Sequence, residues 1–369
     1  MIGLSLAYEL AGEGLSVRVI DAQQPGHESS WAGAGIMPPA PPQPRSAYEE
    51  LWLLSNRLHE SFARELGEAT GIDTGYRQCG SLHFGRRESE RSALNSTMSF
   101  WQARGIDYQE LAPAGVRKLE PQLNVDDAAA YFLPGEFQIR NPRHLQALLA
   151  ACRQRGVNVE PGRPAESFEQ RGRRTAVVTE QGILEAATVC VTSGAWTSKL
   201  LEPLGATLAI RPIRGQIALL ATDPPLLARI VYEGPHYLVP RDDGKLLVGS
   251  TLEDVGFDRS TTDEAIDRLL EFAHDVLPAT RELTLERCWA GLRPCSADGL
   301  PYMGPLDGFD NLFVAAGHFR SGLQLSPGTA KVMADLVQGR TPLVDLTDFR
   351  PNRHSTVHAS GMPAAPWLG

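Results

Sequence analysis

Three short sequences near the carboxyl end of the chain decide the fold. They read WAGLRP at residues 289–294, DGLPYMGP at 298–305 and GHFRSGLQL at 317–325. The apolar run 311–315 before the third sequence predicts a buried strand, and residues from about 329 to 338 predict a helix. The loop between them brings backbone amides and the positive end of a helix together, which favours negative charge. We therefore expect a βα unit that holds an anionic group at this loop.

A second helix and strand pair opens the chain. Ile2, Leu6 and Leu10 recur every four residues, and the β-prone run 16–20 stops at Asp21. A helix and a strand ending in an acid about 20 residues after a glycine form the back half of a dinucleotide fingerprint. Gly3 is then its third glycine, and Asp21 the acid that binds the ribose. A packing glycine and a surface acid would give the same pattern.

The front of that fingerprint, a strand ending in Gly-x-Gly, would lie before Met1. An intact version carries Val or Ile next to Ile2, and a GTG codon reads as methionine when it is taken as a start. Our hypothesis is that Met1 is such a valine and that roughly a dozen upstream residues complete the motif. Its absence puts the cofactor affinity of these 369 residues in doubt.

The middle of the chain alternates between helical and antiparallel patterns. Helices are expected at 48–66, 90–104 and 141–155, and strands at 81–84, 174–179, 187–192 and 210–251, with a turn at 242–244. The predicted fold class is α/β, a Rossmann-like nucleotide-binding domain interleaved with an antiparallel α+β substrate domain. The first domain takes residues 1–45, 140–205 and 290–350, the second 46–139 and 206–289, and 351–369 form a frayed tail.

Composition excludes several classes of protein. The net charge of −9 disfavours nucleic acid, and no apolar stretch approaches the roughly 20 residues that span a membrane. Neither the five cysteines nor the nine histidines are spaced as metal ligands, so no metal is expected. Without a signal-peptide pattern, a cytoplasmic location is expected.

Nearly the whole chain resembles the D-amino-acid-oxidase superfamily, and the glycine oxidases of thiamine biosynthesis most. Four segments carry the resemblance: SSWAGAGIM (29–37), VCVTSGAWT (189–197), RPIRGQ (211–216) and residues 289–325. The resemblance implies that the first of the two domains is an FAD-binding domain and that it holds FAD without a covalent link. Related sarcosine oxidases attach the flavin to a cysteine, and the equivalent position here falls near Gly291, although Cys288 and Cys295 leave the question open.

The resemblance also implies which residues bind the cofactor. In the family the first segment meets the flavin phosphates and ribose, the second closes the nucleotide site, and the 317–325 loop faces the flavin. The expected FAD-binding residues are Met1, Ile2, Gly3, Asp21, Ala22, Ser29, Ser30, Ala34, Gly35, Ile36, Ala165, Gly194, His318, Phe319, Arg320, Ser321, Gly322, Leu323 and Gln324. For His318, pocket wall and simple structural support are equally open.

Four residues are expected at the substrate. Arg293 matches the family's carboxylate-binding arginine, whose planar fork binds both oxygens. Tyr237 resembles the tyrosine that meets the same carboxylate, with a core tyrosine as the alternative, and Arg320 lies over the site. Leu252, at the end of an expected strand 248–252, narrows the pocket unless it is sheet core. Arg214 and His236 are interpreted as structural, Arg214 through a domain-joining ion pair.

The implied activity is oxidation of glycine or another small amine acid, such as sarcosine or a small D-amino acid. Hydride passes to flavin N5, the imine is released, and O2 becomes H2O2. The imine serves thiamine thiazole synthesis. No histidine or carboxylate of the protein needs to act as a base. A homo-oligomer, a tetramer, is implied by the family. The alternatives are a quinone-linked D-amino-acid dehydrogenase and a truncated inactive flavoprotein.

Overall fold

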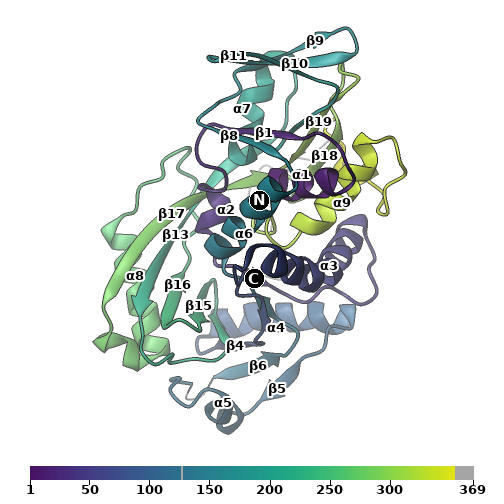
Figure 1. The fold of residues 1–369 in the computed structure, drawn as a ribbon. Coiled ribbons are helices and arrows are strands. Elements are labelled where there is room, and N and C mark those ends of the chain that lie inside the picture. The colour runs from purple at the N-terminus through teal and green to yellow at the C-terminus, as the bar shows by residue number, and fades with distance from the viewer. Residues whose placement is uncertain (126–127, 354–369) are drawn as a thin grey trace.

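The computed structural model describes residues 1–125 and 128–353 (Figure 1). The helices are α1 (Ile2–Gly12), α2 (Ser29–Ala32), α3 (Ala47–Thr70), α4 (Glu88–Arg104), α5 (Pro113–Leu119), α6 (Asn141–Gln154), α7 (Thr197–Leu201), α8 (Asp263–Val276) and α9 (Ser326–Val337). The strands of the nucleotide side are β1 (Arg18–Asp21), β8 (Asn158–Pro161), β9 (Ser167–Arg171), β10 (Arg174–Thr179), β11 (Gly182–Ala186), β12 (Val189–Val191), β18 (Tyr302–Pro305) and β19 (Leu312–Ala316). The other strands are β2 (Ile36–Met37), β3 (Arg77–Gln78), β4 (Ser81–Gly85), β5 (Gln109–Leu111), β6 (Ala129–Leu133), β7 (Phe137–Gln138), β13 (Ile210–Ala221), β14 (Ile230–Glu233), β15 (His236–Arg241), β16 (Lys245–Gly249) and β17 (Leu285–Ser296).

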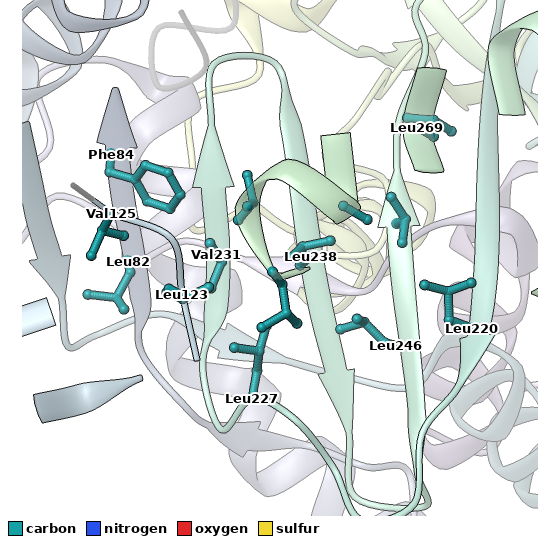
Figure 2. Close-up of a cluster of buried hydrophobic side chains, with 14 of the residues drawn as sticks. Leu82, Phe84, Leu123, Val125, Leu220, Leu227, Val231, Leu238, Leu246 and Leu269 are labelled. Atoms are coloured by element: carbon teal, nitrogen blue, oxygen red, sulfur yellow. The ribbon is translucent and has the colours of Figure 1, made fainter. Parts of the chain in front are cut away.

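The largest sheet has eight strands in the order β17-β13-β16-β15-β14-β4-β6-β5. Its pairs are antiparallel apart from β14 and β4, which run parallel. Because side chains alternate along a strand, Leu238 and Val248 point to one face, and Val239 and Leu247 to the other. The first face packs against apolar residues of α8, as Figure 2 shows around Leu269. The second face meets Ala34, so it turns toward the loop that follows α2.

The nucleotide side is built from short parallel pairs. β1 pairs with β8, and β12 pairs with β19, which also carries antiparallel β18. Within the described ranges, β1 and β12 each pair with a strand on one side only. Helix α1 packs along α9 and α6, and its small Ala7 is buried in that contact (Figure 1). The chain crosses between this side and the large sheet several times, which makes the two parts interleaved.

The α/β fold class is confirmed, and most expected elements are found within a few residues of their predicted ends. One expectation is wrong: β16 ends at Gly249, so Leu252 lies beyond the strand in the loop before α8. The chain then stays beside β13 with its register shifted by one residue, because Glu253 pairs with Arg214 through both backbone and side chain. The domain division stays a prediction; β17 runs without a break across residue 290. Residues 354–369 of the expected tail lie outside the described residues. Among described helices, none combines the length and apolar character of a membrane span.

Candidate active site

The expected nucleotide-binding residues gather at the carboxyl ends of β1, β8 and β12, beside the start of α1. Asp21 ends β1, and the Gln23 amide donates to its carboxylate at 2.9 Å. Burial raises the pKa of Asp21. The Arg163 amide donates to the Asp21 carbonyl at 2.8 Å, which brings the segment leading to Ala165 alongside. Exposed Ala22 follows Asp21.

Two glycines allow the close approach of backbone at this end. A Cβ on Gly3 would lie 2.5 Å from the Thr192 hydroxyl oxygen, so α1 packs against the end of β12 only with glycine there. Gly194 has a φ of +54°, a conformation that favours glycine, as the chain turns out of β12. The Met1 amine donates to Ser30 at 3.1 Å, which joins the start of α1 and Ile2 to α2.

The segment of residues 29–37, called loop 29–37 below, is held by side chains from other elements. Its carbonyl oxygens accept hydrogen bonds in three places: Ser30 from Asn141 Nδ2 (2.8 Å), Ala32 from Trp289 Nε1 (3.0 Å) and Ala34 from Arg241 Nη2 (2.6 Å). Gly35 has a φ of +72°, and a Cβ there would overlap the Ile139 carbonyl. Within the described part of the chain, the amides of Ala34 and Gly35 donate to no acceptor. They remain free for a ligand beside Ser29 and Ile36.

The segment of residues 317–325, called loop 317–325, presents a second row of amides. Phe319 has a φ of +48°, a rare conformation for a residue other than glycine and a form of strain typical of functional sites. Over the described ranges, the amides of Arg320, Gly322 and Leu323 find no acceptor. Helix α9 follows directly at Ser326, so its positive end lies behind these donors.

Side chains under loop 317–325 fix its shape. Tyr48 donates to Ser321 at 2.9 Å, and Gln324 donates to the Pro38 carbonyl at 2.8 Å. His318 is buried, and its Nε2 lies 3.1 Å from the Thr329 hydroxyl of α9. Burial lowers the pKa of His318 to about 3, so the ring is neutral. These contacts favour structural support as the role of His318.

Arg293 of β17 lies on the face of the sheet that meets loop 29–37. Its guanidinium covers Gly215 of β13, where an added Cβ would overlap it. It donates to the Thr251 carbonyl at 3.1 Å and to the Ser250 hydroxyl at 2.8 Å. Burial lowers the pKa of Arg293, and the Tyr237 hydroxyl beside it acts in the opposite direction. The Tyr237 ring in turn covers Gly249, so two glycines make room for the two polar groups.

A second guanidinium, that of Arg320, lies near Arg293. Burial and then the charge of Arg293 lower the pKa of Arg320 to about 10. In the described part of the chain, its buried Nε has no hydrogen-bond partner. Among the described residues, neither Arg293 nor Arg320 forms an ion pair with a carboxylate. Two half-buried cations next to Tyr237, with no anion beside them among the described residues, form a site suited to a ligand carboxylate.

The remaining candidates lie around this site. Leu252 directly follows Thr251, is half-buried and belongs to no hydrophobic cluster of the described residues, so it is not sheet core. His236 packs on Phe272 of α8 at 5.1 Å, on the opposite face of the sheet from Tyr237. Its structural interpretation agrees with that position.

Arg214 forms the ion pairs that the sequence suggested. Its guanidinium donates to Glu253 at 2.7 Å and to Asp258 at 2.6 Å. The expectation that this pair joins two domains is wrong, because both partners lie in the loop after β16. Arg214 therefore shapes the segment that carries Thr251 and Leu252.

Three residues that hold loop 29–37 were not predicted: Asn141, Trp289 and Arg241. Trp289 stood in a quoted motif, but nothing in that motif indicated its bond to Ala32. Arg241 directly precedes a hairpin turn, a position typical of a surface arginine. Their acceptors are backbone carbonyls more than 100 residues away along the chain, which leave no trace in local sequence.

The family of FAD dependent oxidoreductases matches residues 1–336. The chain belongs to this family. This chain is 36% identical over 358 residues to a glycine oxidase of Pseudomonas aeruginosa. The alignment covers 95% of this chain and 96% of that protein. The crystal structure of glycine oxidase from Geobacillus kaustophilus superposes with a TM-score of 0.91 at 31% identity and covers 96% of both chains. The protein is thus an FAD-dependent amino-acid oxidoreductase.

Two further relatives have different names. Hydrogen cyanide synthase subunit HcnC of Pseudomonas aeruginosa is 30% identical over 415 residues, covering 99% of this chain and 97% of that protein. The bifunctional protein ThiO/ThiG of Synechocystis is 32% identical over 367 residues, covering 96% of this chain and 53% of that protein. Relatives with similar sequence identity to this chain therefore carry different functional names.

The residues at the site fit FAD. The ribose and pyrophosphate ends of such a cofactor need an acid at a strand end and a helix N-terminus with no side chain in the way, which Asp21, Gly3 and the start of α1 supply. The flavin ring needs backbone donors at its polar edge, and the free amides of loops 29–37 and 317–325 meet that need. Cys288 points toward Thr261 on the face of α8, away from loop 29–37.

Proposed function

We propose that this oxidase acts on glycine, or on sarcosine or a small D-amino acid, with O2 as the acceptor. The observation that carries the proposal is the pair of half-buried guanidinium groups of Arg293 and Arg320, which lie beside Tyr237 and have no carboxylate partner among the described residues. A planar guanidinium and a hydroxyl can hold both oxygens of a substrate carboxylate in one orientation. Holding the carboxylate fixes the substrate α-carbon relative to the cofactor.

The chemistry divides between cofactor and protein. FAD, when bound, accepts the hydride of the substrate α-carbon and passes both electrons to O2, which becomes H2O2 with two protons. The amine gives up its proton before the hydride leaves, and the imine then hydrolyses in water to an oxo acid and ammonia. Arg293 and Tyr237 bind the carboxylate, and Arg320 adds positive charge over the same site. The amides of loop 317–325 and the start of α9 favour negative charge on the facing group.

A small substrate is proposed because large side chains occupy the space over two glycines of the site. Gly215 and Gly249 are covered by Arg293 and Tyr237, and Leu252 lies next to the Thr251 carbonyl that holds Arg293. We propose that Leu252 closes the space beyond the α-carbon, where a bulky D-amino acid would place its side chain. FAD is proposed to be bound without a covalent link.

One panel of assays tests the proposal. Glycine, sarcosine, D-alanine and D-phenylalanine are supplied to the purified holoenzyme, with peroxide detection in air and a quinone dye under anaerobic conditions. Peroxide with the small substrates supports the oxidase. Dye reduction without peroxide supports a quinone-linked dehydrogenase instead, and no turnover with any substrate contradicts both.

A second candidate is a subunit of an enzyme that makes hydrogen cyanide, which the relative HcnC favours. Cyanide measured in the glycine reaction separates it from the first candidate, which yields ammonia and an oxo acid. We further propose that the imine serves thiamine thiazole synthesis, supported by the relative ThiO/ThiG. Growth without thiamine of a bacterium that lacks its own glycine oxidase, restored by this chain, tests that role.

A further inference from the structure

Arg241, at the end of β15, is buried at 6% exposure and has no acid partner among the described residues. Its Nη1 donates to the Gln138 side chain at 2.7 Å and to the Ile139 carbonyl at 3.0 Å. Its Nη2 donates to the Ala34 carbonyl at 2.6 Å. One guanidinium thus joins the large sheet to β7 and to loop 29–37.

The two acids that directly follow Arg241 in the sequence form ion pairs with other arginines. Asp242, the next residue, pairs with Arg77, and Asp243 pairs with Arg140 and, at 3.3 Å, with Arg143. Burial of Arg241, followed by the charges of Arg140 and Arg77, lowers its pKa to about 9. Among the described residues its Nε has no partner, so the three neutral acceptors of its terminal nitrogens carry the whole compensation for burying the cation.

The bond to Ala34 fixes the side of loop 29–37 that carries free donors. The Ala34 carbonyl points to Arg241, and the amides of Ala34 and Gly35 have no acceptor in the described ranges. Gly35 leaves no room to shift, because it lies against the Ile139 carbonyl that Arg241 also binds. The same guanidinium therefore holds both backbone segments that meet here, at Ala34 and at Ile139.

We propose that Arg241 is a positioning residue that holds loop 29–37 in the conformation that binds the flavin, without touching the flavin or the substrate. The proposal rests on the family's cofactor and not on the identity of the substrate. Loss of the guanidinium should free the Ala34 carbonyl, let the loop amides rotate, and weaken FAD binding.

The test measures FAD binding in the absence of substrate. Apoprotein prepared from the holoenzyme is titrated with FAD by fluorescence for wild type, Arg241→Met and Arg241→Lys, and amide exchange is followed in loop 29–37. We expect FAD to bind at least tenfold more weakly to Arg241→Met. For Arg241→Lys we expect at least threefold weaker binding, because one ammonium cannot span Ala34 and the Gln138–Ile139 pair. Exchange in loop 29–37 should be faster in both.

Arg229→Met is the matched control. Arg229 borders β14 in the same sheet and binds the Leu119 carbonyl and Glu120 beside α5, at the far end of the sheet from α2 (Figure 1). Its loss should lower the melting temperature without changing FAD affinity. Arg241→Lys is the more conservative variant and decides the question should Arg241→Met not fold. An Arg241→Lys protein with wild-type FAD affinity and wild-type exchange in loop 29–37 overturns the proposal, as does a loss of affinity equal to that of Arg229→Met.

Because no substrate enters these measurements, their outcome is independent of the proposed function. An enzyme that oxidises no glycine but loses FAD on Arg241→Met contradicts the substrate and supports the role of Arg241. An active glycine oxidase with unaltered FAD affinity in both variants supports the substrate and contradicts the role of Arg241.

Discussion

Gly215→Ala should displace the carboxylate clamp without removing any of its groups. Gly215 lies in β13 under Arg293, and an added Cβ would overlap the guanidinium carbon and both terminal nitrogens. Those atoms form the far end of a flexible side chain, so Arg293 should move while the backbone of β13 and β17 stays in register. The backbone of Gly215 has no positive φ, so alanine is tolerated there.

The magnitude follows from the distance that Arg293 must move. Relief of the overlap needs a shift on the order of 1 Å, and a misplacement of that size costs up to about 100-fold in rate. We expect kcat/KM for glycine to fall roughly 10- to 100-fold, which is about 1.4–2.7 kcal/mol. Most of the loss should appear in KM, because the carboxylate is bound in ground and transition states alike. The free energy of unfolding should change by less than about 1 kcal/mol, since the entropy gained by replacing glycine offsets mild overpacking.

The assay combines peroxide-coupled kinetics with glycine, the flavin absorption spectrum and a thermal melt. Gly67→Ala is the control: Gly67 lies in helix α3, and a Cβ there would meet nothing closer than the Ile72 carbonyl at 3.7 Å. That change should raise stability by up to about 1 kcal/mol through helix propensity and leave kinetics unaltered. A Gly215→Ala enzyme with wild-type KM and kcat would refute the placement of Arg293 over the substrate.

Three other changes test neighbouring parts of the argument. Arg293→Ala should raise KM for glycine by about 10²–10³-fold with flavin content unchanged, since losing one partner of a buried charge pair costs roughly 2–5 kcal/mol; an unaltered KM would count against the clamp. Leu252→Ala should raise kcat/KM for D-phenylalanine relative to glycine with little change in melting temperature, because Leu252 is half-buried outside the core; an unchanged ratio removes it from the pocket. Burial lowers the pKa of His59 to about 4 and of His144 and His318 to about 3. Unfolded histidine binds a proton below about pH 6.5 and these folded ones do not, so stability is full above that pH and falls below it by about 1.4 kcal/mol per histidine per pH unit. Urea midpoints that stay constant from pH 7 to pH 5 would contradict the burial of these rings.

The elements that sequence predicted well are those whose pattern is local. The turn at 242–244 joins β15 and β16 as expected, because Gly244 takes the positive φ that the tight connection requires. The glycine-rich loop before α9 follows a strand whose apolar run is continuous, and the structure has both. Arg293 was found because its neighbours form a dense motif, although the motif did not indicate that Gly215 is needed beneath it.

The end of β16 was misplaced because its cause is not local. Residues 248–252 continue a strand pattern past Gly249, but Glu253 pairs with Arg214 across 39 residues and shifts the register against β13 by one residue, which ends the regular strand. An ion pair between a strand and a loop cannot be assigned from the spacing of either partner. The consequence reaches the site, since the Thr251 carbonyl in this shifted segment accepts a hydrogen bond from Arg293.

Arg214 and Arg241 show why a buried arginine's role cannot be inferred from nearby acids in sequence. Arg241 is followed at once by two aspartates and uses neither, because both lie in a hairpin turn that directs them to the outer arginines Arg77 and Arg140. Arg214 has no acid among its immediate neighbours, yet it binds two, because a loop returns over it. Arg241 is therefore left with two backbone carbonyls and the Gln138 side-chain oxygen, which only the folded chain brings together. That dependence on long-range backbone is what ties Arg241 to loop 29–37 and makes flavin binding, rather than surface charge, the property its loss should change.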